Sequence, residues 1–412
     1  MRGAPAWQGR RSVQHPSSGS TLRADPPSPQ GEKARGDGQR KPGVIALRGR
    51  LKRQAPYSLP GSGGVSGTTI LLLCIAFDDL TSANVPLKTR LTERFAIRHP
   101  ILLAPMGVMA GGRLAAAVSH AGGLGLIGGG YGDEAWLDKE FAAAGNARVG
   151  CGFITWSLAT RPHLLDRVLE RQPAALMLSF GSPAPFAAHI REAGVPIICQ
   201  VQSMLHAREA LDVGADVIVA QGKEAGGHSG HRSTFTLVPE IADLLAKQSP
   251  ETLLVAAGGV GDGRALAAAL MLGADGVLVG TRFIAAAESA APRGFQEAII
   301  AADGDKTIKT TTVDIARNYR WPTDEFVARV LRNRFVAAWH GREGQLAEEE
   351  TLATQSSDYW DAFYAGDAEN TGVLMGEVAG VIQGVESAGR VIEDMVGQAE
   401  CLLADGPQRI VD

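Results

Sequence analysis

Eight short apolar runs, separated by helix-like segments, constrain the fold of this chain more than any other feature of its sequence. The runs cover residues 101–106, 124–127, 149–154, 175–180, 196–201, 217–221, 253–257 and 277–280. Strands that alternate with helices predict a parallel sheet. Eight such units predict an α/β fold of the (β/α)8 type, a TIM barrel, with its active site at the carboxyl ends of the strands. An open, doubly wound sheet is the competing architecture, but no G-x-G-x-x-G follows the first run.

The 412 residues divide by composition into three predicted parts. Residues 1–88 are rich in Gly, Pro, Ser and Arg, and their first 53 residues hold nine Arg and three Lys against three acidic residues. Such a segment buries too little apolar surface to offset its ordering entropy, which predicts a disordered extension. A transit peptide, a nucleic-acid arm and a non-functional extension all remain open. Residues 89–290 form the predicted barrel, and 291–412 a predicted helical addition that packs on it. In the addition the stretch 323–338 is predicted to be an amphipathic helix. Aromatic residues of the addition either contact substrate at the barrel mouth or pack between helices: Tyr359, Trp360, Phe363 and Tyr364.

Composition and charge exclude several classes of function. A net charge of −4 gives no electrostatic footprint for nucleic acid. No apolar run approaches the roughly 20 residues of a membrane-spanning helix. The four cysteines lack metal-site or disulfide spacing, so no metal is expected and a reducing compartment, the cytoplasm, is predicted. The oligomeric expectation is a monomer or a homodimer.

The most specific motif is Gln221-Gly-Lys-Glu-Ala-Gly-Gly-His-Ser-Gly230, directly after the sixth run. Gly226 and Gly227 leave backbone amides uncovered, and Gln221 ends the strand, so all three are candidate cofactor ligands. His228 follows on a loop held by a rigid scaffold. An imidazole titrates near neutral pH, so His228 is the candidate catalytic residue that takes a proton or stabilises an anion. A purely structural histidine is the alternative.

Two glycine turns end the seventh and eighth runs, at Gly258-Gly259 and Gly280-Thr281. TIM barrels commonly hold phosphate with the loops after these two strands. The four residues are therefore candidate phosphate ligands, through backbone N–H groups and one hydroxyl.

Further candidates for contact with a flat cofactor lie after the first and fifth runs. Pro105 ends the first strand because it lacks a backbone donor. Met106 offers a polarizable thioether and Gly107 an uncovered backbone. Gln200 presents an amide that suits the edge of a flavin. Packing in the barrel core is the alternative for Met106 and Gln200.

Together these motifs resemble the nitronate monooxygenase family, formerly called 2-nitropropane dioxygenases. The resemblance rests on Pro105-Met106, on the loop from Gly226 to Gly230, and on the two glycine turns, and it covers roughly residues 91–400. It implies non-covalently bound FMN, with His228 in the place of the family's catalytic histidine. It also implies oxidation of a nitroalkane or nitronate by oxygen to a carbonyl compound and nitrite.

The sequence departs from that family pattern at two positions. Many members have an asparagine at the end of the third strand, where this chain has Ile154-Thr155-Trp156, and a lysine where Gln200 stands. The same fold and histidine loop occur in FMN-dependent NAD(P)H:quinone reductases and enoyl-ACP reductases. A reductase with NAD(P)H as partner is therefore the alternative function.

Overall fold

The computed structural model describes residues 87–406, and the predicted extension of residues 1–88 lies almost entirely outside them. Eight parallel strands form one sheet in the order β1-β9-β8-β6-β5-β4-β3-β2. They are β1 (Ile101–Leu103), β2 (Leu126–Gly130), β3 (Gly150–Ile154), β4 (Leu176–Ser179), β5 (Ile197–Val201), β6 (Val217–Gln221), β8 (Leu253–Ala257) and β9 (Gly276–Val279). A parallel bridge from Leu102 to Leu124 brings the sheet's two edges together. The predicted TIM barrel is confirmed.

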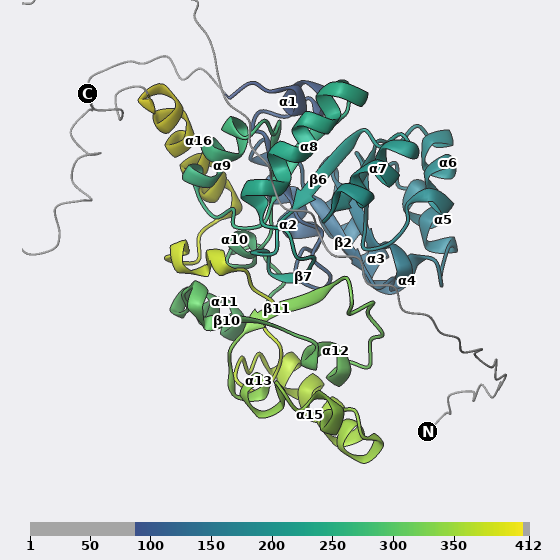
Figure 1. Cartoon of the computed structure of the whole chain (residues 1–412), viewed down its shortest axis with the longest axis vertical. Coiled ribbons are helices and arrows are strands. Elements are labelled where there is room, and N and C mark those ends of the chain that lie inside the picture. The colour runs from purple at the N-terminus through teal and green to yellow at the C-terminus, as the bar shows by residue number, and fades with distance from the viewer. Residues whose placement is uncertain (1–86, 407–412) are drawn as a thin grey trace, which may run out of the picture. The chain divides into compact units, whose positions relative to one another are not determined.

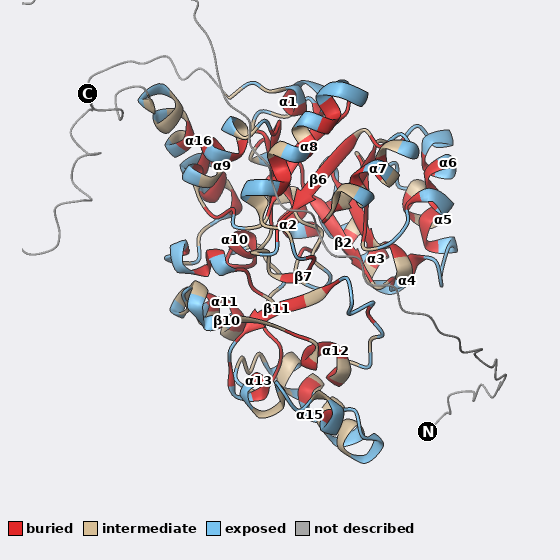
Figure 2. Ribbon diagram, viewed as in Figure 1, coloured by how far each residue is buried: buried red, intermediate tan, exposed pale blue. Residues whose placement is uncertain are grey.

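An outer ring of helices covers the sheet (Figure 1). The ring contains α2 (Gly112–His120), α3 (Glu134–Ala144), α4 (Thr155–Leu158), α5 (His163–Leu169), α6 (Ala184–Glu192), α7 (Met204–Asp212), α8 (Thr234–Gln248) and α9 (Gly263–Met271). The strands are buried on both faces, as Figure 2 shows in red. This double burial explains why their sequences are apolar runs and not alternating patterns. Leu91 and Phe95 of α1 (Arg90–Phe95) pack with the inward-facing residues of the barrel.

The second strand lies later in the chain than the sequence indicates, and it ends in Gly128-Gly129-Gly130. Glycines weaken strand propensity, which hides this end of the strand from a reading of apolar runs. Packing requires them, since a Cβ on Gly128 would lie 2.3 Å from the Met106 carbonyl oxygen. The shift places Tyr131 at the mouth of the barrel.

The sequence predicts a helical addition after the barrel, but the structure shows that this region also contains strands. Its helical segments are α10 (Thr281–Ile284), α11 (Arg293–Ala301), η2 (Gly304–Lys306), α12 (Thr312–Ala316), α13 (Arg334–Trp339), α14 (Glu343–Leu346), α15 (Glu349–Ala365) and η3 (Glu377–Val381). Between them β10 (Thr307–Thr310) and β11 (Val327–Leu331) pair antiparallel, and β11 pairs with β7 (Gly227–Ser229) from the barrel's sixth loop. The stretch 323–338, expected to be an amphipathic helix, contains β11 and then α13.

The last helix, α16 (Ala388–Ala404), returns to the barrel and packs against α9 and α2. A Cβ on Gly263 at the start of α9 would lie 2.3 Å from the Met395 carbonyl oxygen, so these helices touch through backbone. The Gly263 amide also donates to the Gln398 side chain at 2.7 Å. The addition is thus inserted between the last barrel strand and the last outer helix. The division at residue 290/291 remains a prediction.

Tyr359 tests the packing of the addition. The sequence left open whether Tyr359, Trp360, Phe363 and Tyr364 contact substrate or pack between helices. The structure buries Tyr359 against Phe335 inside the addition, whereas Tyr364 on the same helix is 79% exposed. Tyr359→Ala should therefore lower the free energy of unfolding by about 3–5 kcal/mol. The matched control, Tyr364→Ala, should change it by less than about 0.5 kcal/mol. Urea denaturation measures both, and equal losses would contradict this assignment.

Candidate active site

His228 lies on β7 at the mouth of the barrel, and its side chain is 5% exposed. Its Nε2 lies 2.8 Å from Oδ2 of Asp314 on α12, which is 3% exposed. A carboxylate oxygen only accepts hydrogen bonds, so Nε2 carries the proton and donates it. Nδ1 is then the nitrogen with a free lone pair. Burial lowers the pKa of His228 below its usual value of 6.5, and the bond to Asp314 opposes part of that shift. The resulting neutral imidazole is a competent base.

An aromatic wall surrounds this histidine. The Trp321 ring stacks on the imidazole with centroids 3.4 Å apart and planes 6° apart. Phe180, after β4, meets the imidazole edge-on at 6.2 Å. The indole N–H of Trp321 donates to the Tyr131 hydroxyl at 2.9 Å. The stacking fixes the imidazole plane and keeps bulk water from one of its faces.

Polar groups extend the site beyond the histidine. The guanidinium of Arg317 lies 5.3 Å from the centre of the Tyr131 ring and 4.7 Å from that of Tyr319. Among the residues described, the Ser229 hydroxyl and Asp314 Oδ1 are buried without a hydrogen-bond partner. Buried polar atoms rarely stay unpaired in a resting protein. The mouth therefore offers a positive charge and free polar atoms to a polar ligand.

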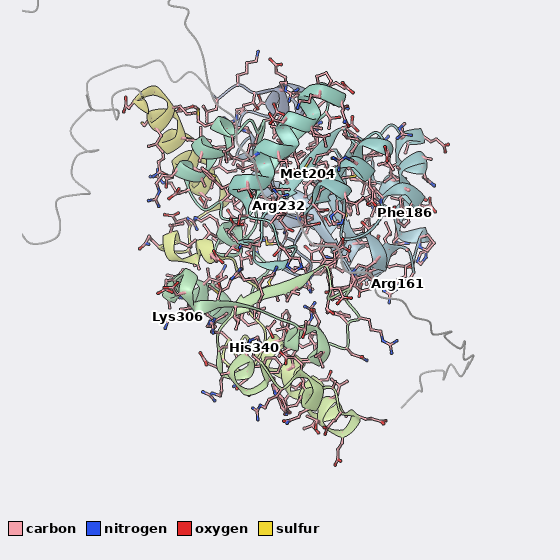
Figure 3. The ribbon with its side chains drawn as sticks, viewed as in Figure 1. Arg161, Phe186, Met204, Arg232, Lys306 and His340 are labelled. Atoms are coloured by element: carbon pink, nitrogen blue, oxygen red, sulfur yellow. The ribbon has the colours of Figure 1, made fainter. Side chains whose placement is uncertain are left out.

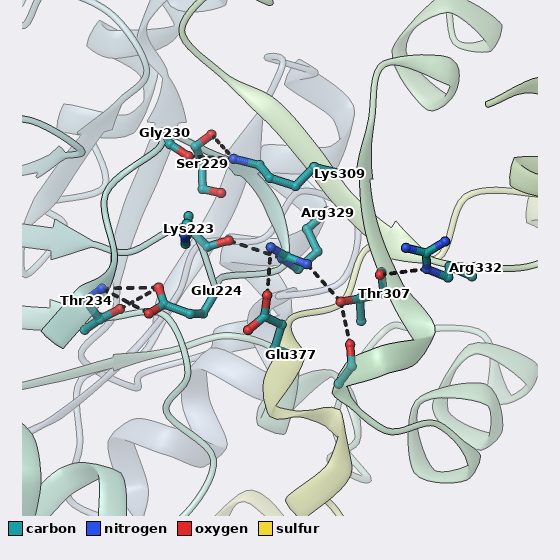
Figure 4. A network of polar contacts seen from close by, with 11 residues as sticks. Lys223, Glu224, Ser229, Gly230, Thr234, Thr307, Lys309, Arg329, Arg332 and Glu377 are labelled. Atoms are coloured by element: carbon teal, nitrogen blue, oxygen red, sulfur yellow. Dashed lines mark hydrogen bonds and ion pairs between the residues drawn. The ribbon is translucent and has the colours of Figure 1, made fainter. Parts of the chain in front are cut away.

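Lys309 and Arg329 of the addition form hydrogen bonds with the backbone of the barrel loop that contains His228 (Figure 4). The ammonium group of Lys309 donates to the backbone carbonyls of Ser229, at 2.9 Å, and Gly230, at 2.5 Å. Arg329 on β11 donates to the Lys223 carbonyl at 3.2 Å and pairs with Glu377 at 2.8 Å. Burial and two neighbouring cations lower the pKa of Lys309 to about 8. Figure 3 shows the side chains of the whole described chain, with Arg232 labelled on the barrel and Lys306 labelled on the addition.

The predicted glycine turns lie at the ends of the neighbouring strands β8 and β9, with open space beside Gly259 and Gly280. Gly258 and Gly259 have φ values of +95° and +75°, which disfavour any side chain. A Cβ on Gly259 would have its nearest heavy atom 4.0 Å away. A Cβ on Gly280 would meet only Met106 Sδ, at 3.5 Å, and Ala104 Cβ, at 3.6 Å. Met106 and the Gly280 turn are thus neighbours across the mouth, as expected if both contact one ligand.

The remaining predicted residues occupy the same end of the barrel. The Gln200 amide donates to Gln221 Oε1 at 3.1 Å, which places both side chains together. Gly226 lies so close to the addition that a Cβ would be 2.5 Å from the Gly376 nitrogen. The Thr281 hydroxyl accepts from that same Gly376 amide at 3.0 Å. The backbone of Gly227 is in the left-handed region, with φ +70°. Pro105 packs beside Gly152, and Gly107 lies close to Gly130.

Sequence reasoning missed the residues that contact His228 from the addition. Asp314 and Trp321 lie 86 and 93 positions after His228 in the chain. No motif around either residue indicates that it contacts the histidine. Tyr131 and Phe180 had a usable signal, because each directly follows a barrel strand and so must lie at the mouth.

Comparison with known proteins identifies the family. The family model described as nitronate monooxygenase matches residues 88–148 and 154–398. The chain belongs to the nitronate monooxygenase family. Members of this family are oxidoreductases, and flavin is typical of them. The chain is therefore an enzyme of the oxidoreductase class, built on a TIM barrel. None of the helices among residues 87–406 is long and apolar enough to cross a membrane.

Three proteins show what this chain is similar to. The chain is 34% identical over 334 residues to nitronate monooxygenase npaC of Metarhizium robertsii. This alignment covers 74% of this chain and 91% of npaC. FabK from Thermotoga maritima superimposes with a TM-score of 0.68 at 29% identity, covering 78% of this chain and 99% of FabK. Nitroalkane oxidase from Streptomyces ansochromogenes gives 0.63 at 26% identity, with coverages of 76% and 99%.

Proposed function

We propose that this enzyme oxidises small nitroalkanes or their nitronates with oxygen and bound FMN, giving a carbonyl compound and nitrite. The observation that carries the proposal is the buried His228–Asp314 pair at the barrel mouth, the same end of the barrel as the open turns at Gly259 and Gly280. A neutral imidazole there can take the acidic α-proton of a nitroalkane. A nitronate has already lost that proton and needs only binding and charge stabilisation.

The residues present fit one flavin mononucleotide. Backbone N–H groups of Gly258, Gly259, Gly280 and Thr281 would hold its single phosphate, since Gly259 and Gly280 have open space that a side chain would fill. The Gln200 and Gln221 amides and the Met106 side chain would contact the ring system. When bound, the flavin supplies the electron acceptor that no amino-acid side chain provides.

The protein's own residues would hold the substrate and move one proton. Asp314 fixes the imidazole tautomer through Nε2, so that Nδ1 accepts the α-proton. The imidazolium that forms stays paired with the Asp314 carboxylate, which stabilises the new charge. Arg317 places a positive charge close enough to favour an anionic nitro group. Trp321 and Phe180 restrict water around the base, which strengthens these interactions.

The cofactor is tested first. The purified protein should be yellow, and heat denaturation should release FMN and not FAD, because the two glycine turns suit one phosphate and no dinucleotide fingerprint is present. Chromatography of the released cofactor measures this. Release of FAD, or a colourless protein, would contradict the proposal.

The reaction is tested by anaerobic mixing with ethane nitronate or with NADH while the flavin absorbance is recorded. Bleaching by the nitronate at the rate of turnover supports the proposal. Bleaching by NADH at that rate, with none by the nitronate, would instead make this chain an NAD(P)H-dependent quinone or enoyl-ACP reductase.

A further inference from the structure

A cavity of about 330 Å³ lies beside the aromatic wall. It is enclosed by the carboxyl ends of β4 and β5, by α7, and by residues 325–326 of the addition. Its lining includes the buried apolar side chains of Leu178, Cys199, Val201 and Ala210. Its volume is within the range of small-molecule pockets, about 300–1,000 Å³.

Phe180 separates this cavity from His228. Its ring lines the cavity and lies 5.1 Å from the Trp321 ring and 6.2 Å from the imidazole, centre to centre. Its backbone has φ +64°, a conformation that is unusual for an aromatic residue. Such backbone strain concentrates at ligand sites. The cavity and the base therefore share Phe180 as a wall, and a chain that extends from one to the other has to pass this ring.

Charge at the rim restricts what the cavity can receive. Glu209 and Glu325 both line it, and Glu325 pairs with His206. Two carboxylates repel a phosphate or a carboxylate. The apolar side chains of the lining, which also includes the uncharged amides of Gln200 and Gln202, favour methylene groups. The rim and lining together favour an uncharged, apolar occupant.

We propose that this cavity binds the uncharged apolar chain of the substrate whose nitro group lies at His228. The preferred substrates are then straight-chain nitronates of several carbons, not nitroethane-sized ones. This inference rests on the proposed function for the reacting group and on the cavity alone for the chain.

Chain length provides the kinetic test. Each methylene moved into apolar surroundings favours binding by up to about fourfold, and this lining is only partly apolar, so about twofold per methylene is the lower expectation. The ratio of kcat/KM for hexane nitronate to that for ethane nitronate should therefore exceed about tenfold in the unmodified holoenzyme. Ser182→Trp at the exposed rim and Ala210→Leu in the lining should each bring the ratio below about threefold. Ala184→Trp is the matched control, because Ala184 is exposed on α6 and does not line the cavity; it should keep the full ratio.

A binding measurement separates failure of this inference from failure of the proposed function. Nile red, an uncharged apolar dye, should bind the holoenzyme with enhanced fluorescence, bind at least tenfold more weakly to Ser182→Trp and Ala210→Leu, and bind normally to Ala184→Trp. This pattern supports the apolar site even if no nitronate is oxidised. Nitronate oxidation whose chain-length ratio is unchanged in Ser182→Trp, with Nile red binding also unchanged, would overturn the inference and leave the proposed function intact.

Discussion

His228→Asn should slow the oxidation of neutral nitroethane by about 10²–10⁴-fold, the usual contribution of a general base. The oxidation of ethane nitronate should slow far less, since that substrate has no carbon-bound proton to lose. Asparagine keeps some hydrogen-bonding capacity and is smaller than histidine, so flavin content should survive. Steady-state kcat/KM for the two substrates, at matched flavin occupancy, measures the difference. Equal losses on both would show that His228 binds the anion and is not the base.

The pH dependence of the unmodified enzyme provides a second measure. Only the neutral imidazole accepts a proton, so kcat/KM for nitroethane should rise with pH through one ionisation. Because burial lowers the pKa of His228, that midpoint should lie below 6.5. His231→Asn is the matched control, since His231 is exposed and its ring donates a hydrogen bond to the Asp324 carbonyl, at 3.4 Å, and not to a carboxylate. It should change neither the rate nor the midpoint.

The lowered pKa of His228 also determines how the stability of the protein changes with pH. The unfolded chain binds the His228 proton more readily than the folded protein does. The contribution of the neutral His228 side chain to the free energy of unfolding is therefore complete above about pH 6.5. It is lost as the pH falls through the lower pKa of the folded protein.

Asp314→Asn should have the second large effect, on the order of 10²–10⁴-fold for nitroethane. An asparagine amide can donate to Nε2, which moves the imidazole proton to Nδ1 and removes the base. It also withdraws the negative charge that stabilises the imidazolium, so the pKa of His228 should fall further. The rate and the pH midpoint should both drop while flavin content is unchanged.

The control for this second prediction is Asp305→Asn, because Asp305 is an exposed carboxylate of the same addition. It should leave the rate and the midpoint unaltered. A wild-type midpoint in Asp314→Asn, with the rate merely reduced, would argue that Asp314 supports the structure of the site without setting the state of His228.

The barrel was predictable because its signal is local. Each strand is an apolar run bounded by helix-like segments, and periodicity and glycine turns are visible within ten residues. The mouth could be located for the same reason, since residues such as His228 and Gly258 directly follow strands. Only β2 was displaced by two residues or more at both ends, because its last three residues are glycines whose role is close backbone packing.

The partners of His228 were not predictable in this way. β7, β10 and β11 are three to five residues long. β11 pairs with β10 across 18–24 positions of the chain and with β7 across 98–102 positions. Tertiary pairing decides such strands more than intrinsic propensity does. The stretch 323–338 alternates charged and apolar residues in a way that also fits a helix, and pairing with β7 selects the strand. The pairing of β11 with β7 joins the addition to the loop of His228, and Asp314 and Trp321 contact the imidazole from that addition.

The return of α16 to the barrel has a consequence for biosynthesis. Residues 388–404 leave the ribosome after all eight barrel strands, yet they cover α9 and also α2, which is made about 270 residues earlier. Until α16 docks, the nascent protein exposes an apolar strip on both helices, and such surfaces invite aggregation. Closure of the ring also requires contacts between distant parts of the chain, which slows folding. A stop codon ahead of residue 388 would therefore leave every strand and every residue proposed for the active site in place, and still yield a chain that cannot finish its outer layer.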